Sequence, residues 1–301
     1  MNTVLLPHSI INRRIPMAEL SLLLTAMFWG SSYGITKDAL AYTSVLAFLL
    51  IRFGLTSLLL LPGFLRDSLN GRTKDWRYGV PTGLILLLTL LAETYGIFHT
   101  TASRAAFLIS LCILLTVFLE AITSQQWPRK GIFACAVLSV TGVLLLTQKE
   151  WGWVALNLGD YCILLAALLR ACLVVATQIL MKGKRLSAMN LTCIQANVIA
   201  IGVLIIFMIS DNSALERLPS QLNFWGLTFY LVIFCTIFCF FAQNYGVKHT
   251  SPSKVALLTG SEPAFGALFA IFWLGETLAP IQILGGACIL IATLAASLRS
   301  R

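Results

Sequence analysis

The stretch that decides the fold is 95–108, YGIFHTTASRAAFL, because it returns 150 residues later at 245–258 as YGVKHTSPSKVALL. The two copies agree without a gap at Tyr95, Gly96, His99, Thr100 and Ser103 of the first copy. Apolar residues agree easily by chance in hydrophobic segments, whereas polar and small residues in one register do not. The chain therefore contains an internal repeat, and we expect its two halves to share one architecture.

The composition around this repeat is that of a membrane protein. The 301 residues are 58% hydrophobic and only 11% charged, and the mean hydropathy is +0.87. A soluble domain carries roughly twice that charged fraction. Because a helix needs about 20 residues to cross the hydrocarbon core, the apolar runs predict an all-α integral membrane fold with about ten transmembrane helices. We expect the spans at 18–37, 44–64, 78–98, 104–124, 131–147, 159–181, 187–209, 222–247, 254–274 and 280–298.

The distribution of basic residues predicts how the chain is oriented. With the N-terminus in the cytoplasm, fifteen of the 21 Lys and Arg residues fall on the cytoplasmic side, four fall outside and two lie within spans. Cytoplasmic loops carry such an excess, so we expect both termini in the cytoplasm and the protein in the cell inner membrane. The predicted segments are a cytoplasmic tail at 1–17, a first five-helix repeat at 18–147, a periplasmic linker at 148–158, a second five-helix repeat at 159–298 and a cytoplasmic end at 299–301.

The odd number of spans in each half indicates a function. A copy that follows five spans enters the membrane from the opposite side, so the repeat has inverted topology. Inverted repeats are typical of secondary transporters, in which two halves exchange conformations around a central site. The sequence contains no P-loop, which disfavours a pump driven directly by ATP. We therefore predict secondary transport of a small molecule by alternating access.

Four short motifs are spread along the chain. They are Trp29-Gly30-Ser31 in the first span, Arg52 in the second, Ser261-Glu262-Pro263 in the ninth, and Gly275-Glu276 where the ninth ends. In this order they resemble the drug/metabolite transporter superfamily, EamA type, over nearly the whole chain. The first half departs from the pattern, since Cys112-Ile113 stands opposite Glu262-Pro263. The resemblance implies a ten-helix transporter with its substrate cavity between the halves, in a family that handles amino acids, nucleoside-like metabolites, sugars and drugs.

Ionisable side chains inside the spans mark the candidate site, because a charge at mid-bilayer costs about 2.5–3.5 kcal/mol on insertion scales. Arg52 and Glu93 form either a structural ion pair or part of a binding or gating site. We expect Arg170 to line the cavity and to contact a carboxylate or phosphate of the substrate. Glu262 either couples transport to protons or packs beside the kink at Pro263. With the polar and aromatic neighbours added, the candidate cavity residues are Trp29, Tyr33, Arg52, Glu93, Arg170, Gln195, Gln243 and Glu262.

The predicted function is transport of an amino acid or a related compound, in the direction of export. Uptake or exchange of a charged metabolite, such as a nucleoside-like or S-adenosyl compound, is the alternative. A membrane receptor or assembly protein is an alternative of another class, and it leaves the inverted repeat without a role. The expected partners are a small-molecule substrate and the lipid bilayer. The energy source is either coupling to protons or exchange of substrates down their gradients.

Other kinds of chemistry find no support in the sequence. No catalytic motif of a hydrolase or metalloprotease is present, so we do not expect an enzyme, a catalytic residue or a cofactor. The eight cysteines lie in apolar runs without the spacing of a metal site, and we expect them to be packing residues. Nucleic-acid binding is not expected either, because no basic stripe interleaved with aromatic residues occurs.

Overall fold

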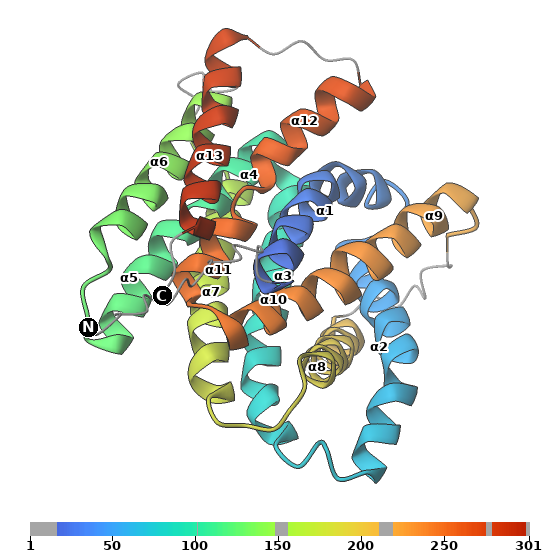
Figure 1. Cartoon of the computed structure of the whole chain (residues 1–301). Helices are drawn as coiled ribbons and strands as arrows, with labels where there is room; N and C mark the ends of the chain where they lie inside the picture. The colour runs from blue at the N-terminus through green and yellow to red at the C-terminus, as the bar shows by residue number, and fades with distance from the viewer. Residues whose placement is uncertain (1–16, 101, 148–155, 211–218, 275–278, 299–301) are drawn as a thin grey trace, which may run out of the picture.

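The computed structural model describes residues 17–100, 102–147, 156–210, 219–274 and 279–298, and its secondary structure within these ranges is helical, without strands (Figure 1). The first half contains α1 (Met17–Ala39), α2 (Val45–Leu69), η1 (Trp76–Tyr78), α3 (Gly79–His99), α4 (Ala102–Ser110), α5 (Cys112–Ser124) and α6 (Lys130–Thr147). The second half contains α7 (Leu158–Met181), α8 (Ala188–Ile209), α9 (Leu222–Tyr230), η3 (Leu231–Phe238), α10 (Cys239–His249), α11 (Pro252–Thr259), α12 (Glu262–Leu274) and α13 (Pro280–Leu298).

Each predicted span coincides with one helix or with helices that follow one another directly. Within the described ranges, six stretches are long and apolar enough to cross a membrane by length and composition: 45–69, 76–99, 105–124, 158–181, 188–209 and 222–249. Shorter apolar helices lie at 130–145 and 280–296. The prediction of an all-α membrane fold built from two repeats is confirmed. Most of the predicted tail, linker and final residues lie outside the described part of the chain.

The local sequence determines where several helices begin. The second helix of each half starts at a serine cap: Ser44 accepts the N–H of Ala47, and Ser187 accepts the N–H of Asn190. Such a cap satisfies a backbone donor that the first helical turn leaves unpaired. The first helix of the second half starts at a capping box formed by Asn157.

The two halves pack against each other in a symmetric way. The third span, α3, lies along α7, and the eighth span, from α9 through η3 to α10, lies along α1 in the same manner. Likewise α2 packs on α8, and α6 packs on α13. Two glycines mark equivalent crossings, since a Cβ on Gly96 would lie 2.6 Å from Ile163 and one on Gly246 would lie 2.8 Å from Leu22. Exchanging the halves reproduces the contacts, as a pseudo-two-fold axis requires.

The fourth span of each half is broken near its middle, where the sequence predicted a continuous span in the first half and a kink at Pro263 in the second. α4 ends before Leu111 and α5 begins after it, while α11 and α12 are separated by Gly260 and Ser261. In the second half, Pro263 lacks an N–H and its ring clashes with the carbonyl four residues earlier, which accounts for the break. The first half breaks at the equivalent place without a proline. Both breaks bring helix ends to the depth of the cavity described below.

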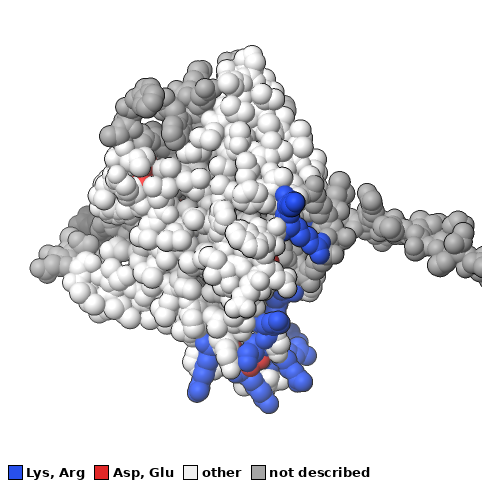
Figure 2. Space-filling view, turned by 90° about the vertical axis from the view of Figure 1, so that its left-hand side faces the viewer, with Lys and Arg blue, Asp and Glu red and all other residues white. Residues whose placement is uncertain are grey.

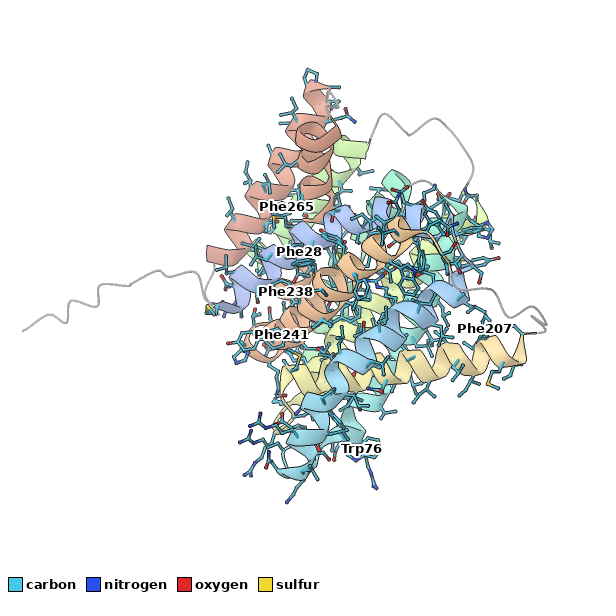
Figure 3. The ribbon with its side chains drawn as sticks, turned by 90° about the vertical axis from the view of Figure 1, so that its right-hand side faces the viewer. Phe28, Trp76, Phe207, Phe238, Phe241 and Phe265 are labelled. Carbon is cyan, nitrogen blue, oxygen red and sulfur yellow. The ribbon has the colours of Figure 1, made fainter. Side chains whose placement is uncertain are left out.

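The eighth span contains a second irregularity, the π-helical segment η3. The N–H of Cys239 bonds to the carbonyl of Phe234, five residues back. This segment packs on α1 through aromatic rings, with the centroids of Phe28 and Phe238 5.6 Å apart (Figure 3). π-Helical turns often occur at functional sites because they free a backbone carbonyl for another partner.

Basic residues gather at one end of the molecule. Figure 2 shows most of the Lys and Arg side chains of this face at that end, below a surface that is almost without charge. The loop after α2 and the loop after α7 meet there, since the N–H of Arg185 bonds to Asp75 and the ammonium of Lys184 lies 3.6 Å from the centre of the Tyr78 ring. The charge asymmetry that the sequence predicted is therefore present along the molecule. Its assignment to the cytoplasmic side stays a prediction.

Candidate functional site

A small cavity lies between the two halves at the depth of the broken helices. Residues of α1, α2 and α3 line one side, and residues of α7, α10 and α12 line the other. Its free space is only about 40 Å³, which is room for a few water molecules. A metabolite does not fit until the surrounding helices move. Seven of the eight predicted site residues line it: Trp29, Tyr33, Arg52, Glu93, Arg170, Gln243 and Glu262.

Arg170 and Glu262 form a buried ion pair across the cavity. Arg170 Nη2 donates to Glu262 Oε1 at 2.5 Å, and the side chains are 9% and 4% exposed. The hydroxyl of Tyr33 donates to the other carboxylate oxygen at 3.1 Å. Glu262 is the first residue of α12, where the unpaired N–H groups of the helix also favour a negative charge. Three helices thus fix one carboxylate.

Trp29 holds the guanidinium from the other side. The Arg170 guanidinium carbon lies 4.3 Å from the centre of the Trp29 ring, within the range of a cation–π contact. The indole N–H of Trp29 donates to the carbonyl of Cys235 at 2.8 Å. In a regular α-helix the N–H of Cys239 would use that carbonyl, but in η3 it bonds to Phe234 instead. The π-helical segment therefore positions Trp29.

Arg52 and Glu93 do not form the structural ion pair that was one interpretation of the sequence. Arg52 is buried, and its Nε donates to the hydroxyl of Thr236 at 2.8 Å. That hydroxyl donates in turn to the Leu231 carbonyl, a link across the π-helical turn. Among the described residues, no salt bridge reaches either Arg52 or Glu93. Within the described part of the chain, the cavity therefore presents one guanidinium and one carboxylate that form no salt bridge.

The repeat pairs the site residues one by one. Trp29 and Arg170 are the thirteenth residues of α1 and α7, and Cys112 and Glu262 are the first residues of α5 and α12. Arg52 corresponds to Gln195, the eighth residue of α2 and of α8. Glu93 corresponds to Gln243, since each stands two residues before a repeated Tyr-Gly. In each of the four pairs, one member is charged and the other is neutral.

Gln195 is the predicted site residue that does not line the cavity. Its amide donates to Thr82 at 3.1 Å and accepts from Asn244 at 2.8 Å. It joins α8 to α3 and α10, the kind of contact between helices that buried amides make in membranes. The roles of the other seven in substrate binding stay predictions.

The sequence did not point to Thr236 or to the Cys235 carbonyl, although both orient site residues. A threonine in an apolar run is common, and a backbone acceptor has no signature in the sequence. Their role becomes visible only once the helix is known to contain a π-helical turn. Whether that turn forms depends on what packs against the helix. Cys235 and Cys239 share a turn, and no cluster of metal-binding side chains occurs in the described structure.

Trp29→Phe tests the link between the π-helical segment and the site. The ring stays over Arg170, but the buried Cys235 carbonyl loses the indole N–H, at a cost of about 1–3 kcal/mol. We expect substrate counterflow in proteoliposomes to fall by about tenfold or more. Trp225→Phe is the matched control, because Trp225 also donates to a backbone carbonyl, that of Pro219, but lies away from the cavity. Equal rates for Trp29→Phe and the native protein would show that the bond has no role in transport.

A helical membrane protein with two repeats and a charged cavity between them has the architecture of a secondary transporter. The model of the EamA-like transporter family matches residues 16–148 and 157–298. The chain therefore belongs to the EamA-like transporter family.

Known proteins agree with this assignment. A protein of Archaeoglobus fulgidus named "Uncharacterized transporter" is 27% identical over 285 residues, which cover 94% of this chain and 86% of that protein. A second protein of the same name and organism is 24% identical over 268 residues, or 86% of this chain and 89% of the relative. One solved crystal structure superposes with a TM-score of 0.75 at 14% identity, covering 93% of this chain and 96% of the other. The structural match shows the fold alone.

Proposed function

We propose that this protein is a secondary transporter for a zwitterionic amino acid or a closely related compound. The observation that carries this proposal is the pair of Arg52 and Glu93, which line one cavity without a salt bridge to any described residue. A substrate with separate negative and positive groups supplies both missing partners. The other two charges, Arg170 and Glu262, already neutralise each other.

Each half of the substrate has a defined partner in this proposal. The Nε–H of Arg52 donates to Thr236. The remaining N–H groups of the guanidinium can bind a substrate carboxylate through two parallel hydrogen bonds. The carboxylate of Glu93 accepts the ammonium. The four charges of the cavity add up to zero, and a zwitterion keeps that balance. A substrate with net charge would leave an uncompensated charge in a medium of low polarity, which is costly. This favours an amino acid over an S-adenosyl compound or another charged metabolite.

Alternating access follows from the closed cavity and its symmetric surroundings. The space of about 40 Å³ must widen toward one side to admit a substrate and toward the other to release it. The backbone hydrogen bonds of the fourth spans are already interrupted at the breaks. The helices can therefore bend there without breaking further hydrogen bonds.

Protons supply the driving force in this scheme. A proton and the substrate ammonium both neutralise Glu93, so each excludes the other. This exclusion couples inward proton movement to export of the amino acid.

Counterflow in proteoliposomes tests this function. Vesicles preloaded with unlabelled compound are given the labelled compound outside, with separate trials for amino acids, nucleosides and S-adenosyl compounds. We expect amino acids alone to accumulate. Arg52→Gln should weaken apparent affinity by about 10–100-fold, because hydrogen bonds to charged groups contribute about 1.5–3 kcal/mol. Arg72→Gln, an exposed arginine outside the cavity, should behave as the native protein.

The coupling has its own readout. Glu93→Gln removes the carboxylate that a proton and the substrate share, so an imposed pH gradient should no longer drive accumulation. Accumulation of nucleosides or S-adenosyl compounds but not amino acids would contradict the proposed substrate. Native rates for Arg52→Gln would contradict the proposed site.

A further inference from the structure

A buried ion pair joins the first turn of α1 to the first turn of α11. The ammonium of Lys254 donates to Glu19 Oε1, and the two residues are 7% and 4% exposed. Glu19 belongs to the first half of the chain and Lys254 to the second, so the pair ties the halves together. Because both charges are buried, separating them leaves each without compensation unless water enters.

Other contacts close the same mouth of the protein. Glu120, near the end of α5, accepts hydrogen bonds from the N–H and the hydroxyl of Ser253. Gln178, near the end of α7, donates to the carbonyl of Thr250 at 3.2 Å. The ends of α5 and α7 therefore meet the beginning of α11 at one face. This face, where α1 begins, is called here the first mouth.

The opposite face repeats the arrangement with the halves exchanged. Lys37, near the end of α1, donates to the carbonyl of Thr100 at 2.8 Å, as Gln178 does to Thr250 at the first mouth. The hydroxyl of Thr100 donates to Asp160 at 2.7 Å. This face, where α7 begins, is the second mouth. The equivalent hydroxyl at the first mouth, that of Thr250, has no hydrogen-bond partner among the described residues.

The positions of the Glu19–Lys254 ion pair also recur in the other repeat. Glu19 and Asp160 are the third residues of α1 and α7, and Lys254 and Arg104 are the third residues of α11 and α4. The side chain of Arg104 lies outside the described residues, but its position in the helix is the equivalent of Lys254. At the first mouth the acid comes from the first half and the base from the second.

We propose that the Glu19–Lys254 ion pair and the Thr100–Asp160 hydrogen bond are two latches that hold the halves together at opposite mouths, and that one must open in each step of the transport cycle. This inference rests on the proposed alternating access. The charge pattern agrees with two different requirements. Both mouths must close, so the acidic residue of the latch, Glu19 or Asp160, occurs in both repeats. A single substrate binds in one orientation. In each repeat-related pair of cavity positions, only one of the two residues is therefore charged.

Hydrogen–deuterium exchange of the full chain in lipid nanodiscs tests the latches without substrate. Lys254→Met should raise exchange at least twofold in the first turns of α1 and α11, because the first mouth opens. Exchange in the first turns of α4 and α7 should fall, because the second mouth then closes more tightly. Asp160→Asn should give the reverse pattern. Lys248→Met is the matched control, since this lysine of the same mouth bonds to the Leu186 carbonyl and not to a carboxylate.

Two double variants separate a latch from a loss of folding. Glu19→Gln with Lys254→Met leaves no lone buried charge, so it should open the first mouth while keeping the thermal stability of the native protein. Glu19→Lys with Lys254→Glu restores the attraction and should restore native exchange. The proposal is overturned if both mouths change exchange in the same direction, or if the exchanged charges behave like the single variants. Native protein without counterflow would instead contradict the proposed function, while the exchange pattern still decides on the latches.

Discussion

Arg170→Met is expected to reduce counterflow by at least about 100-fold and to destabilise the protein. The substitution leaves Glu262 as a buried carboxylate without its cation, and breaking a buried pair costs about 3–5 kcal/mol. Tyr33 still donates to that carboxylate, but a hydroxyl does not replace a guanidinium at 2.5 Å. Trp29 also loses the cation that lies over its ring. The cavity would then carry a net negative charge.

The double variant Arg170→Met with Glu262→Gln shows what the pair does. It removes both charges, so thermal stability should return close to the native value, as replacement of buried ion pairs often permits. Counterflow should stay low, because the proposed cavity is organised around this carboxylate and its partners. Recovery of both stability and transport would mean that the pair serves only to hold α7 and α12 together. Arg66→Met, at an exposed arginine of the charged end, controls for loss of a basic residue.

Gly30→Ala is expected to lower both the stability of the protein and its transport. A Cβ at this position would lie 2.6 Å from the carbonyl oxygen of Glu262 and 2.8 Å from the backbone nitrogen of Gly266. Backbone atoms cannot turn aside as a flexible side chain can, so α1 and α12 must separate. Overpacking of this kind costs about 1–3 kcal/mol. The shift also moves Glu262 relative to Arg170, so we expect transport to fall together with stability.

Gly34→Ala is a matched control on the same helix. It lies one turn beyond Gly30, and a Cβ there meets nothing within 4 Å. Since alanine favours helix more than glycine does, by about 1 kcal/mol, this variant should be as stable as the native protein or slightly more stable. Thermal unfolding in detergent and counterflow in vesicles report the two properties separately. Equal melting temperatures for Gly30→Ala and Gly34→Ala would contradict the close crossing of α1 and α12.

Much of the fold could be predicted because the signals are local. Apolar runs indicate spans whatever their neighbours are, and a repeat with five spans per copy determines the relative direction of the halves. The breaks in the fourth spans were harder to predict. Pro263 indicates one of them, but the break at Leu111 has no residue of its own that disrupts a helix. Its cause lies in the packing around it, which the linear sequence does not display.

The candidate site was predicted in its residue types more fully than in its contacts. Buried charges are rare in spans and therefore conspicuous, so Arg52, Glu93, Arg170 and Glu262 could all be found. Which of them pair could not be predicted. Successive residues of a helix point about 100° apart, and a span can rotate about its axis without any change in its hydropathy. Packing of the helices sets that rotation.

By itself, the sequence determined the membrane class, the ten spans, the inverted repeat and the set of charged residues that must avoid lipid. These follow from hydropathy and from agreement between two parts of one chain. Only the tertiary structure decided that Arg170 pairs with Glu262, that Arg52 donates a hydrogen bond to Thr236, and that a π-helical turn positions Trp29. These contacts join residues between 92 and 206 positions apart. Their geometry is set where helices from both halves pack together, because a side chain's partner depends on the orientation of two helices and not on the composition of either one.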